Sequence, residues 1–270
     1  KVFGGGRQDG LIMKFTPNLT GIIFSTFFGG AGSDACFVLS INPATSNLYV
    51  AGGTTSATLP GTIGGSPTEP GIGIVYQGGE SDGFITEINP DGSAVIKTIF
   101  AGTAGNDLVY GIQFDKFGFP YIMGATTGNW PVKNAAFSNA GAKQFIAKLQ
   151  PDLSTYIYST IFGTNSNKPN ISPVAFLVDR CQNVYVSGWG GKFNDERQYP
   201  NAGTRGMPIT ANALKNTTDG GDFYFFVLEK NAVSQLYGTF YGQTGGFDDH
   251  VDGGTSRFDA NGIIYQAMCA

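Results

Sequence analysis

Glycine occupies 41 of the 270 positions of this chain, whereas only 13% of the residues are charged. Hydrophobic residues make up 41% and aromatic residues 13%, which is enough to fill a core and argues against a disordered chain. The glycines follow no Gly-X-Y period, which excludes collagen. The formal net charge of −4 argues against nucleic-acid binding, which requires a basic surface. Frequent glycine together with ample apolar residues fits a compact all-β protein with many tight turns.

In chain order, the first repeated pattern is an apolar segment that starts with Asp or Lys. It occurs at 9–17, 82–90, 143–151 and 222–230, and the first three copies end in Pro. Leu11, Met13 and Phe15 alternate with Ile12 and Lys14, which is the two-residue period of a β-strand. A second strand follows each copy and carries a marker threonine, at Thr26, Thr98, Thr160 and Thr239. Each copy is therefore predicted to be a β-hairpin.

A second pattern, centred on a tyrosine, alternates with the first. It contains Tyr49, Tyr121, Tyr185 and Tyr265, at intervals of 72, 64 and 80 residues. The threonines recur at similar intervals of 72, 62 and 79 residues. Asp115, Asp179 and Asp259 stand six residues before their tyrosines, and Asn42 stands seven before the first. Two markers that drift together indicate a true internal repeat.

Two hairpins per unit give four short strands in about 60 to 80 residues, which is typical of a β-propeller blade. We therefore predict an all-β fold, a β-propeller of four-stranded antiparallel blades, as one domain over 1–270 or a fragment of one. Three whole blades are expected at 31–102, 103–163 and 164–242, with half blades at about 7–30 and 243–270. The half blades either join into one composite blade or are completed by further blades of a longer chain, and we favour the longer chain. No helix and no membrane insertion are expected.

The repeat resembles a known family. The strings Asp-Gly-Phe-Ile-Thr-Glu-Ile-Asn-Pro at 82–90, Thr-Ile-Phe-Gly at 160–163 and Asn-Val-Tyr-Val-Ser-Gly at 183–188 are similar to the SBBP-type β-propeller repeat, as is the pair Trp130 and Pro131. The likeness covers nearly the whole chain, with departures at Lys143, where the repeat has Asp, at Met268, where it has Gly, and at Trp189 and Gly190.

Two stretches, 179–191 and 248–265, are similar to large secreted proteins of gliding bacteria. Those proteins carry a gliding-motility-associated C-terminal sorting domain for type IX secretion. The resemblance implies a location outside the cell or on the outer-membrane surface of a Gram-negative bacterium. It also implies contact with a secretion translocon.

One candidate metal site surrounds the single histidine of the chain. Asp248, Asp249, His250 and Asp252 could bind a cation, because hard oxygen ligands at short spacing suit calcium. The alternative is a polar loop that enters a strand, as expected at 33–34 and 106–107, and we favour this alternative. No other cofactor is expected. Cys36, Cys181 and Cys269 are too widely spaced for a zinc site or a disulfide framework.

Aromatic residues near the long loops are candidate binding residues. Trp130, Trp189 and Tyr199 could stack on sugar rings or anchor a protein partner, or they could fill the space between blades. The repeated Asp9, Asp82 and Asp222 could ring a propeller mouth, or each could accept backbone N–H bonds at a turn. Their recurrence once per blade favours the structural role.

The function expected from the sequence is a non-enzymatic module of a secreted or cell-surface protein. It would bind a protein or glycan partner in adhesion, as cargo of a type IX-like secretion system. One alternative is a propeller enzyme that acts on glycans with acids at the blade mouths. The other is a structural subunit or plug in an envelope assembly.

Overall fold

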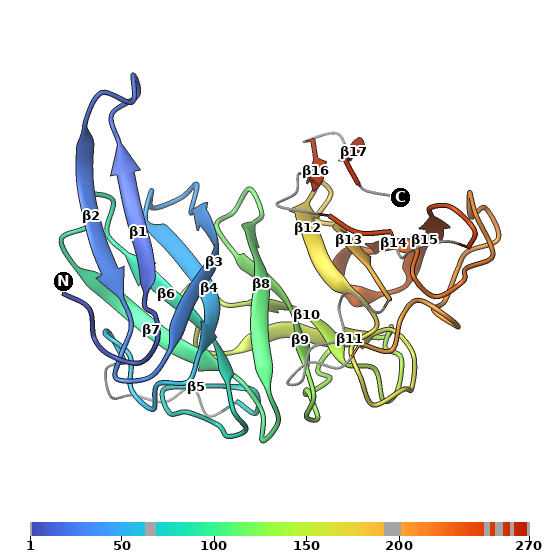
Figure 1. Cartoon of the computed structure of the whole chain (residues 1–270), viewed down its shortest axis with the longest axis horizontal. Helices are drawn as coiled ribbons and strands as arrows, with labels where there is room; N and C mark the ends of the chain where they lie inside the picture. The colour runs from blue at the N-terminus through green and yellow to red at the C-terminus, as the bar shows by residue number, and fades with distance from the viewer. Residues whose placement is uncertain are drawn as a thin grey trace.

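The computed structural model describes residues 2–62, 69–191, 201–245, 249–251, 256–259 and 262–268. The described residues form an all-β structure of three large antiparallel sheets and two separate hairpins (Figure 1). They contain no α-helix, and a short 3-10 turn covers Lys230–Ala232. The all-β prediction is therefore confirmed.

Each large sheet pairs its strands mainly in chain order. The first sheet contains β3 (Asp34–Ile41), β4 (Leu48–Thr54), β6 (Asp82–Ile88) and β7 (Val95–Ala101), with the short β5 (Ile72–Gly73) beside β7. The second contains β8 (Asp107–Phe114), β9 (Pro120–Thr126), β10 (Gln144–Leu149) and β11 (Tyr156–Phe162). The third contains β12 (Ser172–Val178), β13 (Val184–Trp189), β14 (Phe223–Leu228) and β15 (Gln235–Tyr241). The terminal hairpins are β1 (Gly10–Phe15) with β2 (Ile22–Phe28), and β16 (Ser256–Phe258) with β17 (Ile264–Gln266).

The strand registers repeat the same irregularities from sheet to sheet. Pairing of the third strand with the fourth shifts at the last residue of the third strand, at Ile88, Leu149 and Leu228, and β1 shifts in the same way at Phe15. A bulge also interrupts the pairing of the first strand with the second in each sheet. These shared irregularities show that the three sheets and the N-terminal hairpin are copies of one structural unit.

A glycine three residues after each of the first three marker tyrosines lies opposite the bulge. Gly52 pairs with Cys36 at the bulge of β3, and Gly124 pairs with Val109 at the bulge of β8. A Cβ on Gly52 would collide with the carbonyl oxygen of Ala35, and one on Gly124 with that of Leu108. The Tyr-x-x-Gly spacing therefore records a place where two backbones approach too closely for any side chain.

One marker threonine is displaced by a residue from its structural equivalents. Thr26, Thr160 and Thr239 lie opposite Ile12, Ile146 and Phe225, whereas Thr98 lies opposite Thr86. The equivalent position in the first sheet is Ile99, because the strand there has one extra residue, Ala101, before the glycine. A shift of one residue turns the side chain to the other face of a sheet, so the sequence alignment at Thr98 was wrong.

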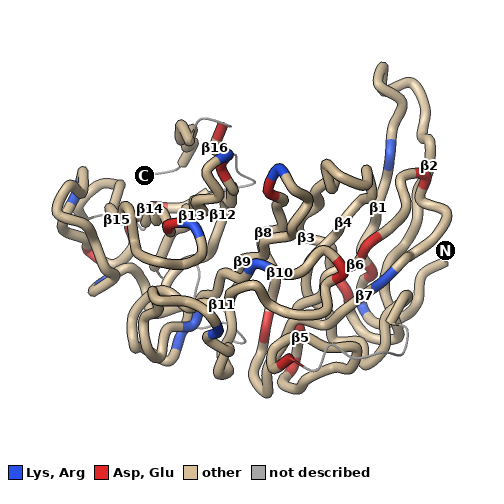
Figure 2. Tube along the Cα trace, turned by 180° about the vertical axis from the view of Figure 1, so that it is seen from behind, with Lys and Arg blue, Asp and Glu red and all other residues tan. Residues whose placement is uncertain are grey.

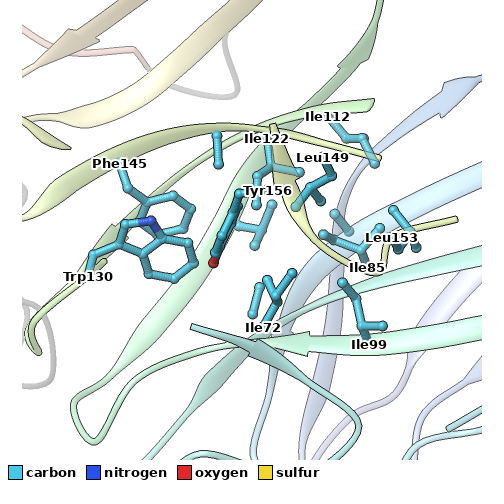
Figure 3. Close-up of a cluster of buried hydrophobic side chains, with 14 of the residues drawn as sticks. Ile72, Ile85, Ile99, Ile112, Ile122, Trp130, Phe145, Leu149, Leu153 and Tyr156 are labelled. Atoms are coloured by element: carbon cyan, nitrogen blue, oxygen red, sulfur yellow. The ribbon is translucent and has the colours of Figure 1, made fainter. Parts of the chain in front are cut away.

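The sheets pack face to face, and a separate apolar cluster fills each space between neighbours. Figure 3 shows the cluster between the first and second sheets, where Ile85 and Ile99 of the first face Leu149 and Tyr156 of the second. Strand β10 contributes to two clusters, since Phe145 and Leu149 join the first and Ile146 joins the second. A central strand thus buries both of its faces.

The sheets follow one another in chain order, with the β1–β2 hairpin beside the first sheet at one end of the molecule and the β16–β17 hairpin beside β12 of the third sheet (Figure 1). Within the described residues, the two hairpins do not pair with each other and the sheets do not close into a ring. No helix of the described residues has the length and apolar character to cross a membrane.

The close approach at the bulge gives a test of the fold. Gly124→Ala is expected to lower the free energy of unfolding by about 2 kcal/mol or more, because overpacking at a rigid site is destabilising. Its new methyl group would overlap the Leu108 carbonyl oxygen and the Phe145 ring. The matched control is Gly21→Ala, whose Cβ would have Thr16 Cγ2 as its nearest neighbour at 3.6 Å. Urea denaturation followed by tryptophan fluorescence measures the free energy of unfolding of both variants. Equal values for Gly124→Ala and Gly21→Ala would contradict the close backbone approach at the bulge.

Candidate functional site

A groove crosses the first strands of the three large sheets. Strands β3, β8 and β12 lie next to one another, and the groove over them has a volume of about 410 Å³. The residues that line it include Phe37, Leu39, Tyr110, Gln113, Phe176 and Phe258. These strands sit at the edges of their sheets, and Met123 of the inner strand β9 also lines the groove.

The alternation of β3 exposes large apolar side chains on the groove side. Phe37, Leu39 and Ile41 are 46%, 56% and 63% exposed, whereas Val38 between them is half-buried. The ring of Phe37 stacks on that of Tyr110, with their centroids 5.5 Å apart and the planes 12° from parallel. A contiguous exposed apolar surface of this kind marks an interaction site more often than a scattered set does.

The bulges influence what the groove can accept. They lie in β3, β8 and β12, and among the described residues each of these strands is paired on one side only. Bulges on edge strands discourage the addition of a further strand. The groove is therefore suited to contacts with apolar side chains rather than to main-chain pairing with a partner strand.

The candidate aromatic residues have separate positions. Trp130 is only 5% exposed and stacks on Phe145, with ring centroids 3.6 Å apart, while its Nε1 donates a 2.9 Å hydrogen bond to Ser159 Oγ. Figure 3 shows this stack inside the cluster between the first two sheets, so Trp130 fills the space between them. Trp189 ends β13 and is half-buried, with its ring centroid 5.9 Å from that of His250. Tyr199 lies outside the described residues.

The candidate calcium residues are only partly within the described chain. Asp248 and Asp252 lie outside it, and Asp249 is buried at 2% exposure. The described residues hold no group of three or more His, Cys, Asp or Glu side chains arranged to bind a metal ion. Asp249 lies near Asp222 instead, because both carboxylates face the α-carbon of Gly242. A Cβ added to Gly242 would collide with the Asp249 carboxylate and lie 2.7 Å from Asp222 Oδ1.

Pairs of polar side chains join consecutive units. The start of a third strand meets the start of the next sheet's first strand, as Asp9 with Asp34, Asp82 with Asp107, Gln144 with Asn170, and Asp222 with Asp249. The members are 25, 25, 26 and 27 residues apart. That near-constant spacing was a signal for these pairs in the sequence, and our reading of the sequence did not use it.

The first member of each acidic pair accepts a backbone N–H bond. Asp9 Oδ2 accepts from Gly4 at 2.6 Å, Asp82 Oδ2 from Gln77, and Asp222 Oδ2 from Asp219 at 3.2 Å. The sequence left two roles open for these aspartates, a ring of carboxylates at a propeller mouth and the acceptance of backbone N–H bonds at a turn. These hydrogen bonds correspond to the second role. Each carboxylate thus fixes the loop before its strand.

The other oxygen, Oδ1, is buried at Asp9 and Asp82 and has no hydrogen-bond partner there, whereas at Asp222 it contacts Lys215 Nζ. Burial raises the pKa of Asp82 to about 7, against the lowering effect of the Gln77 N–H, and the charge of Asp107 adds to the rise. Burial likewise raises the pKa of Asp107 to about 6. Near neutral pH this pair therefore holds a proton.

Two amides lie near the junction of the second and third sheets, where the Asn170 N–H donates to Gln144 Oε1. Lys143, not Gln144, stands at the place of Asp82, because Gln144 pairs with Ala125 as Gly83 pairs with Gly53. The junction pairs thus connect the sheets.

Charged side chains are sparse on the rest of the described structure. Figure 2 shows lysine, arginine, aspartate and glutamate spread along the trace rather than gathered in one region.

The chain matches no protein-family model and no curated protein.

The junction acids give a pH-dependence test. The folded pKa of Asp82, about 7, is raised above its ordinary value of 3.8, so the native state keeps a proton that the unfolded chain releases. The stabilisation is present at acid pH and is lost as pH rises through 7. The Asn side chain of Asp82→Asn is neutral at every pH. The free energy of unfolding of this variant, relative to that of wild type, is therefore expected to be about 2 to 4 kcal/mol higher at pH 8 than at pH 4.

The control for this test is Asp91→Asn, since Asp91 is exposed and its pKa is lowered by the Ser93 backbone N–H. It should show no such gain at high pH. Urea denaturation between pH 4 and 8 measures all three proteins. Identical pH profiles for wild type and Asp82→Asn would show that the buried pair does not share a proton.

Proposed function

We propose that this chain is an array of β-propeller blades and that it is a binding module in adhesion or a related protein interaction. The blade assignment is supported by four-stranded antiparallel sheets that pack face to face in chain order. It is also supported by the side-by-side first strands, since the innermost strands of propeller blades surround a central channel. The groove over β3, β8 and β12 would then be part of that channel.

The observation that carries the binding function is the exposed apolar side of β3 in this groove. Phe37 and Leu39 remain about half exposed although almost every large residue of the central strands is buried. Leaving such side chains in water costs free energy that a bound partner would recover. The partner that fits is a protein segment with apolar or aromatic side chains, because Phe37, Leu39 and Phe176 offer few polar groups to a sugar.

The paired acids do not favour the enzyme alternative. Asp82 and Asp107, whose pKa values are raised towards neutrality, are both fully buried. A general acid must reach the bond that it protonates, and a glycan cannot approach these carboxylates. Their hydrogen bonds to neighbouring loops account for their presence. In the second sheet, Lys143 stands at the place of Asp82.

The proposed location is outside the cell, or on the outer-membrane surface of a Gram-negative bacterium. It is supported by the resemblance of the repeat to the SBBP type and to the secreted proteins of gliding bacteria. A type IX-like secretion translocon would then be a transient partner during export.

The binding function can be tested with a displayed library of random peptides, selected on the whole chain. Selected peptides are expected to be rich in apolar residues and to bind Phe37→Ser at least about tenfold more weakly, a loss typical of a central contact residue. Phe117→Ser is the matched control, because Phe117 is 59% exposed in the β8–β9 turn and is not among the groove residues.

Peptides that bind both variants equally would place recognition elsewhere. A glycan array run in parallel covers the remaining partner class. Binding of a glycan that is lost in Phe37→Ser, with no peptide enriched, would replace the protein partner by a carbohydrate.

A further inference from the structure

The junction between the first and second sheets contains a buried carboxylate oxygen that no described side chain satisfies. Asp82 and Asp107 are both 0% exposed, and Asp82 Oδ1 has no hydrogen-bond partner. Buried carboxylates are normally hydrogen-bonded, paired with a cationic side chain or bound to a metal ion. Within the described part of the chain, no lysine or arginine forms an ion pair with either acid. Lys143 is near enough for its charge to affect Asp107, but its Nζ donates to the carbonyl oxygen of Gly128.

A glycine leaves room for a positive charge beside this oxygen. Gly102 directly follows β7, and a Cβ built on it would lie 2.5 Å from Asp82 Oδ1. The oxygen therefore faces the space that a side chain at this position would fill. Gly102 and Thr103 also line a hollow of about 590 Å³, so an ion can reach this part of the junction from solvent.

The third sheet holds a cation in the equivalent place. Asp222 and Gly242 have the positions there that the first acid and the glycine have in the first sheet. Lys215 Nζ contacts Asp222 Oδ1. The same ammonium donates to the carbonyl oxygens of Gly242, at 2.9 Å, and of Gln243, at 3.2 Å. A carboxylate oxygen and two main-chain carbonyl oxygens thus surround a positive charge at this junction.

The junction between the second and third sheets shows that an acid pair is not needed to join two sheets. Lys143 stands at the place of Asp82. Asn170 stands at the place of Asp107, because each accepts the N–H of the second residue after the preceding strand. These sheets are joined without either carboxylate, so the acids at the other junctions serve a further purpose.

The acid pair with an unsatisfied oxygen recurs between the β1–β2 hairpin and the first sheet. A Cβ built on Gly29 would lie 2.6 Å from Asp9 Oδ1 and 2.7 Å from Asp34 Oδ2, so both carboxylates converge on the glycine. Asp9 Oδ1 is again buried and without a hydrogen-bond partner. Within the described residues, neither acid forms an ion pair with a lysine or arginine.

We propose that the junction of Asp82 and Asp107 binds a calcium ion. Asp82 Oδ1 is a ligand, and Asp107 supplies the second negative charge. The carbonyl oxygens of Gly102 and Thr103 correspond to the two that accept from the Lys215 ammonium, and water from the hollow completes the ligands. Calcium suits this set because it takes about six to eight oxygen ligands, main-chain carbonyls among them, in a flexible geometry.

The junction of Asp9 and Asp34 binds a second ion in the same way. Both sites differ from the one predicted around His250, since each needs only two carboxylates. An ion at Asp82 fixes two sheets to each other, because Asp82 begins a strand of the first sheet and Asp107 begins the second. Neither site includes a residue of the groove, so the calcium sites and the proposed function can fail independently.

Thermal unfolding of the whole chain with added calcium tests the proposal. The measurement is made at pH 8, above the pKa of Asp82, which burial raises to about 7, because protons compete with the ion. About 10 mM CaCl2 is expected to raise the Tm of chelator-treated wild type by about 5 °C, for a Kd of about 10⁻⁴ M. MgCl2 at the same concentration and NaCl at the same ionic strength should have clearly smaller effects. An unchanged Tm, or equal shifts with MgCl2 or NaCl, would overturn the proposal.

Isothermal titration calorimetry with CaCl2 locates the ion. Asp82→Asn is expected to bind one calcium ion fewer than wild type, because the site loses a charged ligand. Asp91→Asn is the matched control, since Asp91 is an exposed acid outside the junctions, and it should bind as many ions as wild type. A count that is the same in Asp82→Asn and wild type would exclude this site.

The variant Lys215→Met covers the case in which Asp82→Asn fails to fold. It removes the ammonium that the third sheet holds between its carboxylate and carbonyl oxygens. If that place is equivalent to the calcium site, the variant gains one calcium ion per chain. An ion count equal to that of wild type would contradict the equivalence on which the proposal rests.

Discussion

The structure depends on the burial of both faces of each sheet against neighbours of the same kind. Strands β10 and β14 are buried at every position, so neither sheet could stand alone in water with its central strands solvated. Stability must then come from stacking, and each added sheet buries the open face of the one before it. This requirement also explains the low charge of the chain, because a sheet packed on both faces has few positions where a charged side chain can reach solvent.

Stacking requires the sheets to meet in a fixed orientation, and two repeated devices supply it. The bulge in each first strand brings backbone against backbone, which is why a glycine follows each of the first three marker tyrosines at the third position. The junction pairs then hold the loop between two sheets, with Asp82 fixed to the Gln77 N–H and Asp107 to the Thr103 N–H. Part of the glycine excess is therefore the consequence of close backbone approach rather than of turns alone.

The repeat could be predicted from the sequence because its markers are local. The alternation in 9–17 and the Tyr-x-x-Gly spacing each lie within one strand, so they indicated the strands and their order correctly. Contacts between units are not local. Trp130 stands next to a long loop in the sequence, yet it stacks on Phe145 of the following strand, and the partner of Asp82 is 25 residues away on another sheet. The groove was missed for the same reason, since Phe37 and Tyr110 meet only after two sheets have packed.

The same requirement determines where the molecule can interact. A stack of sheets that buries every shared face leaves apolar surface in two kinds of place: on the first strands, which have one neighbour each, and on the two ends of the stack. Phe37 and Leu39 are exposed at the first, and Leu11 and Phe15 at the second. The first surface carries bulges that discourage the addition of a further strand. Recognition in the groove through side chains is therefore a consequence of the same packing rule that buries the shared faces of the sheets.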